Sequence, residues 1–292
     1  TQYFEMFCNR GIYHRGWTAV TRHSTPWVFA ELPPFADDTW ELYDTNTDWS
    51  QAHDLAAEMP EKLEELKALF MEEARKYNVL PLDDRRGERF NSDLAGRPTL
   101  IKGNSQLFFG GMGRLTENVV INVKNKSHSV SAQLQVPEGG ATGVIVSQGG
   151  AFAGWSLYVK KGKPKYCYNL FGVQRFYIEG DAEIPSGTHQ VRMEFNYDGG
   201  GLGKSGTVSL YVDGTKTGEG RVEATVPMVF SGDETCDIGS DTASAVSDDY
   251  TPEESHFNGT VEWVQIDIDE AAEDLDHLIT LEERLHIAMA RQ

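Results

Sequence analysis

The sequence is poor in cysteine and contains no long apolar run. Its 292 residues include three cysteines, Cys8, Cys167 and Cys236, which are too scattered for a zinc site built from close ligand pairs. Free thiols are therefore a better interpretation than a disulfide framework. No window approaches the roughly 18 consecutive apolar residues of a membrane-spanning helix, and no signal-peptide pattern opens the chain. We expect no membrane partner.

Basic residues are scarce, above all in the C-terminal part. The chain has 26 lysines and arginines against 45 acids, which gives a formal net charge of −19. Beyond residue 231 the only lysines or arginines are Arg284 and Arg291. An acidic surface repels phosphate backbones, so we expect no nucleic-acid partner. The simplest interpretation of the acidity is a solvated surface that keeps the protein soluble.

The first 86 residues carry the signals of a small antiparallel sheet packed by one helix. Apolar and turn residues predict three short strands, at 12–14, 17–20 and 28–30. Asp48, with Gln51 three residues later, resembles a capping box and predicts a short helix. Pro60, followed by apolar residues at three- and four-residue steps, predicts an amphipathic helix from about residue 60 to 77.

The pattern changes after residue 86. Residues 87–98 are polar and predict a linker, and from residue 99 apolar and polar residues alternate with period two. Val130 to Val136 is an example, and its alternation is typical of a half-buried strand. Many short strands without intervening helices predict an antiparallel two-sheet β-sandwich, a jelly roll, over residues 99–269. Apolar spacing predicts a C-terminal helix over 270–292. The expected fold class is thus α+β followed by all-β.

The last predicted strand contains a slip in phase. Val261 and Trp263 alternate, whereas Val264, Ile266 and Ile268 continue on the opposite face. A β-bulge or burial of the strand on both faces would explain this slip.

Three short sequence motifs in the first 56 residues carry a family resemblance. They are Tyr13-His14-Arg15-Gly16-Trp17, then His23-Ser24-Thr25-Pro26-Trp27, and the series Leu42-Tyr43-Asp44, Asp48 and Asp54-Leu55-Ala56. This succession resembles the C-terminal end of the catalytic domain of bacterial arylsulfatases. The resemblance implies a four-stranded antiparallel sheet packed by one helix for residues 1–86. It also implies a sulfuric ester hydrolase as the parent enzyme.

The remaining residues extend the resemblance. Residues 99–292 are similar to the tail of a long-chain arylsulfatase subgroup. The similarity lies in motifs such as Val191-Arg192-Met193-Glu194-Phe195 and Leu210-Tyr211-Val212-Asp213-Gly214. This tail also looks like a laminin-G or concanavalin-like jelly roll. Likeness of fold does not by itself make it a lectin.

The resemblance implies chemistry that this chain lacks. Sulfatases use a formylglycine nucleophile, usually made from the cysteine of a Cys-x-Pro-x-Arg motif, and none of the three cysteines lies in such a motif. Formylglycine and calcium are therefore expected in an N-terminal catalytic part of the complete enzyme, with no cofactor in this chain. That N-terminal sulfatase domain is the expected partner, with a sulfate-ester small molecule or glycan as substrate and a possible homo-oligomer.

The beginning of the chain leaves its cellular location open. Thr1 stands inside a strand-like run, which suggests a truncated or processed product. The missing signal peptide therefore does not indicate where the parent protein is located. A bacterial cytoplasmic location and a periplasmic location are both open.

His23 is the leading candidate for a substrate-binding residue, with His14 and Trp27 as further candidates. In many sulfatases a sulfate-contacting lysine follows the tryptophan of a Gly-Asp-Trp-Lys run, but here Thr18 follows Trp17. His23 is five residues further on, and an imidazole beside a dianionic ester could donate a hydrogen bond to it. The alternative is that both histidines merely hydrogen bond within the sheet, and that Trp27 is a core or pocket-wall residue.

The sandwich region offers two weaker hypotheses. Loop acids, of which Asp233, Asp237 and Asp241 are the first candidates, could hold a calcium ion together with Glu234, Asp248 and Asp249. No EF-hand spacing supports this, and solvated loop acids are the alternative. The second hypothesis is a carbohydrate-binding jelly roll with aromatic residues on one exposed face, namely Trp155, Tyr158, Tyr166 and Phe171. A purely structural or assembly domain is a third possibility.

Overall fold

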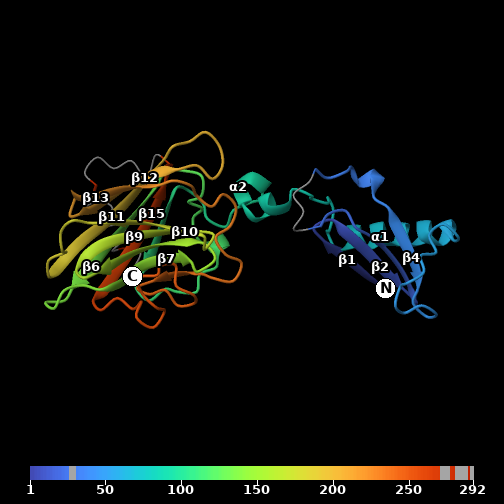
Figure 1. Ribbon diagram of the computed structural model, residues 1–292, viewed down its shortest axis with the longest axis horizontal. Coiled ribbons are helices and arrows are strands. Elements are labelled where there is room, and N and C mark those ends of the chain that lie inside the picture. The colour runs from blue at the N-terminus through green and yellow to red at the C-terminus, as the bar shows by residue number, and fades with distance from the viewer. Residues whose placement is uncertain (26–30, 270–276, 280–288, 290–292) are drawn as a thin grey trace. The chain divides into compact units, whose positions relative to one another are not determined.

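The protein consists of two compact units. A computed structural model describes residues 1–25, 31–269, 277–279 and 289 of the chain. Its contacts divide it into an N-terminal unit, Thr1–Arg89, and a sandwich unit, Phe90–Gln292 (Figure 1). Among the described residues no helix has the length and apolarity needed to cross a bilayer.

The N-terminal unit is a four-stranded antiparallel sheet with one packing helix, as predicted. The strands pair in the order β1-β2-β3-β4. They are β1 (Gln2–Met6), β2 (Asn9–His14), β3 (Trp17–Thr21) and β4 (Trp40–Asp44), and a 3-10 turn, η1 (Phe35–Asp37), precedes β4. The core of the unit is formed by Ile12, Ala19 and Leu42 from the sheet and Leu66, Phe70 and Ala74 from the helix. The predicted strand at 28–30 lies outside the described residues.

The helix α1 (Pro60–Lys76) begins and ends where its sequence predicts. Proline is tolerated in the first helical turn because the N–H groups there have no partner within the helix. Its buried residues, Leu66, Phe70 and Ala74, follow at four-residue steps and so share one face toward the sheet. The helix stops at Tyr77, and Asn78 then adopts the left-handed conformation with a φ of 56°.

The short helix predicted from Asp48 is wrong. The Asp48 carboxylate accepts hydrogen bonds from the N–H groups of Ala52, at 2.7 Å, and His53, at 2.8 Å. These donors lie four and five residues further on, instead of the two or three of a helix N-cap. The side chain therefore closes a loop of turns in place of a helix.

Two short helical segments lead into the sandwich. They are η2 (Arg86–Phe90) and α2 (Ser92–Ala95). The side chain of Asn91 caps α2 by accepting from the N–H of Asp93, and Gly96 ends the helix with a left-handed φ of 69°. The segment predicted as a linker thus contains local helical structure.

The sandwich unit consists of two antiparallel sheets, which confirms the predicted architecture. The six-stranded sheet has the order β13-β12-β11-β6-β15-β5, and the five-stranded sheet has the order β10-β9-β8-β7-β14. The elements are β5 (Ser105–Phe109), η3 (Glu117–Val119), β6 (His128–Val136), β7 (Gly143–Gly149), β8 (Gly154–Lys160), β9 (Lys163–Leu170), β10 (Gln174–Glu179), β11 (Gly187–Tyr197), β12 (Gly206–Val212), β13 (Thr215–Val222), β14 (Cys236–Ile238) and β15 (Thr260–Ile268).

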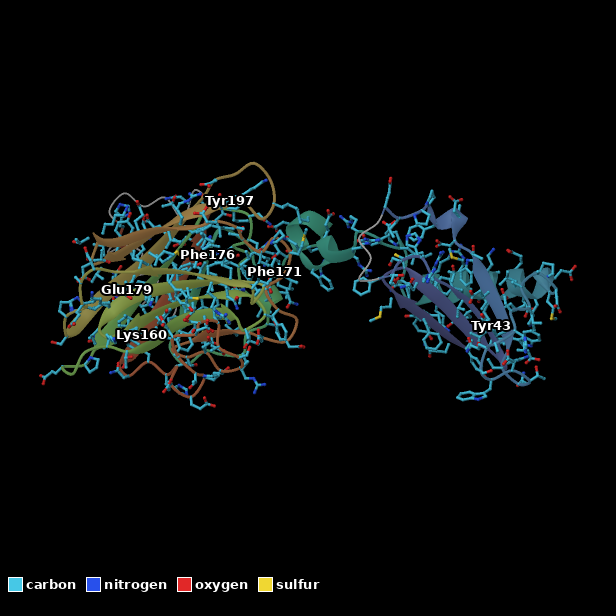
Figure 2. All side chains as sticks on the ribbon, in the orientation of Figure 1. Tyr43, Lys160, Phe171, Phe176, Glu179 and Tyr197 are labelled. Atoms are coloured by element: carbon cyan, nitrogen blue, oxygen red, sulfur yellow. The ribbon has the colours of Figure 1, made fainter. Side chains whose placement is uncertain are left out.

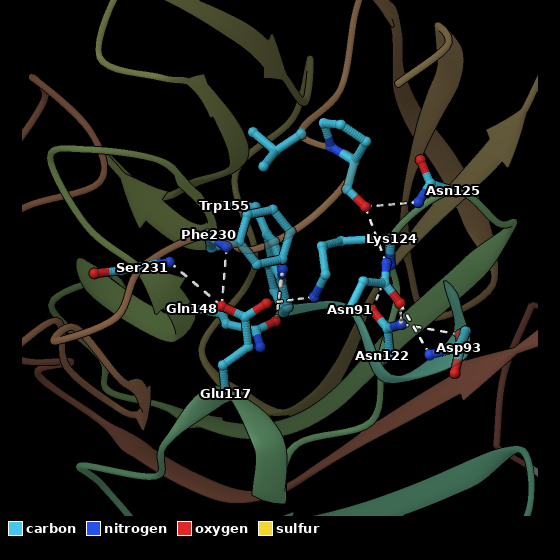
Figure 3. Close-up of polar contacts among 12 residues, drawn as sticks. Asn91, Asp93, Glu117, Asn122, Lys124, Asn125, Gln148, Trp155, Phe230 and Ser231 are labelled. Atoms are coloured by element: carbon cyan, nitrogen blue, oxygen red, sulfur yellow. Dashed lines mark hydrogen bonds and ion pairs between the residues drawn. The ribbon is translucent and has the colours of Figure 1, made fainter. Parts of the chain in front are cut away.

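A buried ion pair ties together loops at one end of the sandwich (Figure 3). The ammonium group of Lys124 pairs with the Glu117 carboxylate and lies 4.8 Å from the centre of the Phe230 ring. Glu117 also accepts hydrogen bonds from the N–H groups of Phe230, at 2.9 Å, and Ser231, at 3.3 Å. These contacts satisfy the buried charges and hold the segment before β14 in place.

The central strands of the six-stranded sheet are buried on both faces, so the prediction of a half-buried β6 is wrong. Ser129 and Ser131, on the face away from the core, are fully buried. Described residues near the C-terminus lie over this face: the N–H of Ile279 donates to Gln190 at 3.0 Å, and His277 stacks on Tyr211 at 4.1 Å. The predicted C-terminal helix itself lies mostly outside the described residues.

The predicted phase slip in the last strand is confirmed. The pairing of β15 with β6 shifts register between Val261 and Trp263, as in a β-bulge. Val261, Trp263, Val264 and Ile266 are consequently all buried.

Candidate functional site

His23 lies in a buried network of the N-terminal unit. Its Nδ1 atom is 2.9 Å and 3.0 Å from the two carboxylate oxygens of Asp38, and its Nε2 atom is 3.4 Å from Asp84. The ring stacks on Phe35 with a centroid distance of 4.3 Å. Both ring nitrogens thus face carboxylates of the same unit.

Arg10 completes this network. Its guanidinium pairs with Asp38 and lies over the rings of Phe35, at 5.4 Å, and Trp40, at 5.3 Å. The Asp38 side chain is 1% exposed, so its charge depends on the Arg10 guanidinium for compensation. The network thus connects β2, the segment after β3 and the turn η1 to one another.

The other two substrate-binding candidates are not part of this network. His14, at the end of β2, shares a hydrogen bond of 2.7 Å with the Thr1 hydroxyl. Trp27 lies outside the described residues. Sequence reasoning missed Arg10 and Asp38, since neither stands in a distinctive motif.

The acid-rich segment of the sandwich forms a strap, which we define as residues 239–259, over the outer face of the five-stranded sheet. Asp249 is the main anchor of the strap. Its carboxylate accepts from the Tyr158 hydroxyl at 2.6 Å and pairs with Lys160 and Lys165 at 2.7 Å each. Val246 also packs on Tyr158, in an apolar cluster beneath the strap.

Asp237 and Asp241 are likewise used for hydrogen bonds within the chain. Asp241 is 1% exposed and accepts from the Tyr250 hydroxyl at 2.7 Å and the Val246 N–H at 3.0 Å. Burial raises the pKa of Asp241 to about 6. Asp237 is 2% exposed and accepts from the hydroxyl of Thr242 at 2.8 Å. The alternative of solvated loop acids is therefore wrong for these two residues.

The three calcium candidates do not form a cluster of metal-binding side chains. Within the described ranges no group of three or more His, Cys, Asp or Glu side chains is arranged to hold a metal. Asp233, the third candidate, is exposed, and its N–H donates to Ser231 at 3.2 Å.

The expected exposed aromatic face is wrong for three of its four residues. Trp155 and Tyr166 are fully buried in the sandwich core, and Tyr158 is covered by the strap. Phe171 alone is exposed, at 55%, in the loop after β9 (Figure 2). Phe152, in the neighbouring loop after β7, is 75% exposed. The two loops are joined by buried Asn169, which donates to the carbonyl oxygen of Gly150 at 2.7 Å.

A cleft of about 520 Å³ opens where the edge strands of the two sheets approach each other. The chain after β5 lies against β14 there, and the Ile238 N–H donates to the Met112 carbonyl at 2.8 Å. Its lining combines apolar residues, Phe109, Met112 and Phe257, with polar ones, Arg114, His256 and Glu262. Convergent polar groups beside an apolar wall are typical of a small-molecule site.

The segment 110–114 is shaped closely to this cleft. A Cβ atom at Gly110 would lie 2.0 Å from the Val261 carbonyl oxygen, and one at Gly113 would lie 2.8 Å from Oδ1 of Asp237. Arg114 follows with a left-handed φ of 55°, and its N–H donates to the same Asp237 oxygen at 2.6 Å. No sequence pattern indicates this site, because its residues come from three separate segments.

Comparisons with known proteins found similar solved structures but no matching family. No protein-family model matches the sequence, and neither does any curated protein. Among solved structures, the chain is similar to the CBM40 of the Ruminococcus gnavus IT-sialidase bound to alpha2,3 sialyllactose, with 13% identity and a TM-score of 0.40 over 60% of this chain and 96% of that chain.

Two further structures are similar at the same level. The heptameric SAP-like pentraxin from Limulus polyphemus has 17% identity and a TM-score of 0.32, covering 60% of this chain and 79% of its own. Mouse laminin alpha1 chain domains LG4-5 have 14% identity and a TM-score of 0.36, covering 60% and 44%. Likeness at this level concerns the fold alone. The fold of this chain is a small α+β unit followed by an antiparallel two-sheet β-sandwich.

Proposed function

We propose that the chain is the C-terminal region of an arylsulfatase-type sulfuric ester hydrolase. The observation that carries this proposal is the N-terminal unit, an antiparallel sheet of order β1-β2-β3-β4 packed by one helix. The resemblance of the sequence to arylsulfatases implies this architecture. The sequence motifs that carry the resemblance lie on β2, β3 and β4 and in the segments beside these strands. In the complete enzyme this unit would form part of the catalytic domain.

Within that enzyme we assign His23 a positioning role at the border of the sulfate pocket. Its two ring nitrogens face Asp38 and Asp84, so the ring holds the segment after β3 in place. In the full-length protein His23→Ala should lower kcat/KM by about 10- to 1000-fold. Glutamine at the same position, which can still donate to Asp38, should recover part of the loss. Unchanged kinetics with unchanged folding would remove His23 from the site.

The nucleophile and the metal belong to another part of the enzyme in this proposal. All three cysteines of the chain are fully buried. Burial raises the pKa of the Cys8 thiol to about 11 and that of Cys167 to about 12. Since none of the three cysteines stands in a Cys-x-Pro-x-Arg motif, we expect this chain alone to hydrolyse no sulfate ester.

The decisive experiment uses the encoding gene and the protein that it produces. The upstream reading frame should contain a Cys-x-Pro-x-Arg or equivalent serine motif. The full-length protein should then hydrolyse a chromogenic aryl sulfate, whereas the 292-residue chain should not. Replacing the motif cysteine by alanine supplies the inactive control. An upstream frame without the motif, or turnover by the purified chain, would overturn the proposal.

Carbohydrate binding by the sandwich unit is a second proposed function, and the cleft after β5 favours it. A sugar ring offers hydroxyl groups and an apolar C–H face, and the cleft supplies Arg114, His256 and Glu262 beside Phe109 and Phe257. The function is tested by applying the 292-residue chain to a glycan array. Selective retention of a group of glycans would support it. Silence together with a stable oligomer in solution would favour an assembly role instead.

A further inference from the structure

We infer that the cleft after β5 binds an acidic saccharide and that Arg114 contacts its anionic group, a sulfate or a carboxylate. The inference rests on the proposed carbohydrate-binding function and specifies its ligand class. Three features of the cleft carry it: a guanidinium without a partner among the described residues, the hydrogen-bonded backbone that presents this group, and acids in the lining that already have partners.

Among the residues that the structure describes, the Arg114 guanidinium has no counter-ion. The residue is exposed, and its side chain forms no hydrogen bond or ion pair with the described part of the chain. Two arginines on strands of the sandwich do pair with acids, Arg175 with Asp248 at 3.3 Å and Arg221 with Asp198 at 2.5 Å. In a chain with 45 acids and 26 lysines and arginines, an unpaired cation at a cleft is available to an external anion.

The backbone that carries Arg114 is fixed by a buried carboxylate. Asp237 accepts from the Arg114 N–H at 2.6 Å and from the N–H and hydroxyl of Thr242 at 3.2 Å and 2.8 Å. Gly113 is required beside it, because a Cβ there would lie 2.8 Å from the carboxylate. A side chain held on fixed backbone loses less conformational freedom on binding, which favours affinity.

The carboxylates that line the cleft already accept hydrogen bonds from other residues of the chain. Asp237 is 2% exposed and saturated by the bonds just described. Glu262 accepts from Gln133 at 2.6 Å and from Gln135 at 3.0 Å. Arg114 and His256, by contrast, are both exposed. A planar guanidinium can bind two oxygens of a sulfate or carboxylate at once, while Phe257 offers an apolar surface to the sugar ring.

The test measures the binding of matched oligosaccharides to the 292-residue chain by calorimetry. The probes are a sulfated oligosaccharide, its desulfated counterpart and an oligosaccharide that carries a uronic acid. We expect the sulfated or the uronic form to bind at least about 10-fold more tightly than the desulfated one. Comparing the two acidic probes shows which anion the cleft prefers.

Variants then assign the preference to Arg114. Arg114→Ala should abolish the advantage of the acidic probe, and Arg114→Lys, which keeps the charge but loses the planar fork, should retain part of it. Arg97→Ala, at another exposed arginine, is the matched control and should change nothing. Equal melting temperatures would show that the variants are folded.

The possible failures are distinguishable. If neutral and acidic probes bind equally and Arg114→Ala has no effect, the inference about acidic saccharides is overturned while carbohydrate binding stands. If none of the three probes and no glycan of the array binds the wild-type chain, the proposed carbohydrate-binding function is itself overturned, and the inference with it.

Discussion

The hydroxyl group of Tyr250 lies 2.7 Å from Oδ2 of Asp241 and donates a hydrogen bond to it. The same hydroxyl lies 2.8 Å from Oγ of Ser156 on β8, so the contact joins two positions of the strap to the five-stranded sheet. Asp241 is 1% exposed. The attachment of the strap therefore depends on a carboxyl group that folding removes from water.

The first prediction concerns pH. The pKa of Asp241 is about 6 in the folded protein against an ordinary 3.8, so the folded state binds this proton more tightly than the unfolded state. The contribution of Asp241 to the free energy of unfolding should therefore fall by about 3 kcal/mol as the pH rises from about 3 to 7, most of it between about pH 4 and 6. Asp241→Asn should remove this part of the pH dependence, as measured by urea unfolding.

The control for this experiment is Asp181→Asn, at an exposed aspartate. That variant should keep the wild-type dependence of the unfolding free energy on pH. Identical curves for wild type and Asp241→Asn would show that Asp241 does not titrate in this range.

The second prediction compares neighbouring acids of the strap. Burial alone would raise the pKa of Asp249, but hydrogen bonds from Lys160, Lys165 and Tyr158 outweigh it and lower the pKa to about 2. Asp249→Asn should reduce the free energy of unfolding by about 1–3 kcal/mol at pH 7. This loss should shrink as the pH falls from about 4 toward 2, where wild-type Asp249 takes up its proton.

Asp248 supplies the matched comparison. Its side chain is 72% exposed and makes one ion pair, with Arg175 at 3.3 Å. Asp248→Asn should change the unfolding free energy by less than about 1 kcal/mol. Equal effects of the two substitutions would contradict the role of Asp249 as the anchor of the strap.

Much of the fold follows from periodicity in the sequence. The four-residue spacing of Leu66, Phe70 and Ala74 predicts α1, and the alternation along β6 and β11 predicts the sandwich. Alternation cannot, however, reveal what covers the second face of a sheet. Ser131 and Tyr158 appear from the sequence to face solvent, yet both are buried, Tyr158 beneath the distant strap.

The candidate sites were harder to predict because their residues meet only in the folded chain. His23 could be selected because it lies in a recognisable sequence motif. No sequence pattern, however, distinguishes Asp38, whose side chain is buried, from the exposed Asp37 beside it. The cleft brings Arg114 together with Asp237 across more than a hundred residues. Their contact depends on the pairing of edge strands, which sequence patterns do not specify.

A third prediction tests the network around His23. Asp38→Asn removes the negative charge between Arg10 and His23 and leaves the buried guanidinium uncompensated. The substitution should destabilise the N-terminal unit by about 3–5 kcal/mol. Hydrogen exchange of amides in β2, β3 and α1 would measure this loss locally. Asp37→Asn, at the adjacent exposed position, should stay within about 0.5 kcal/mol.

The last prediction concerns the three thiols. Cys8, Cys167 and Cys236 are fully buried, and burial raises the pKa of each thiol above its ordinary value. Because the thiolate is the reactive form, a disulfide reagent at pH 8 should modify almost none of them in the native chain over several minutes. All three should react after denaturation.

An introduced thiol provides the positive control for this measurement. Ser186 is exposed, so Ser186→Cys should add one thiol that reacts at once in the native protein. The buried cysteines should react only as fast as their units open, and stabilising conditions should slow that reaction further. Prompt modification of a native cysteine would show that a thiol is accessible.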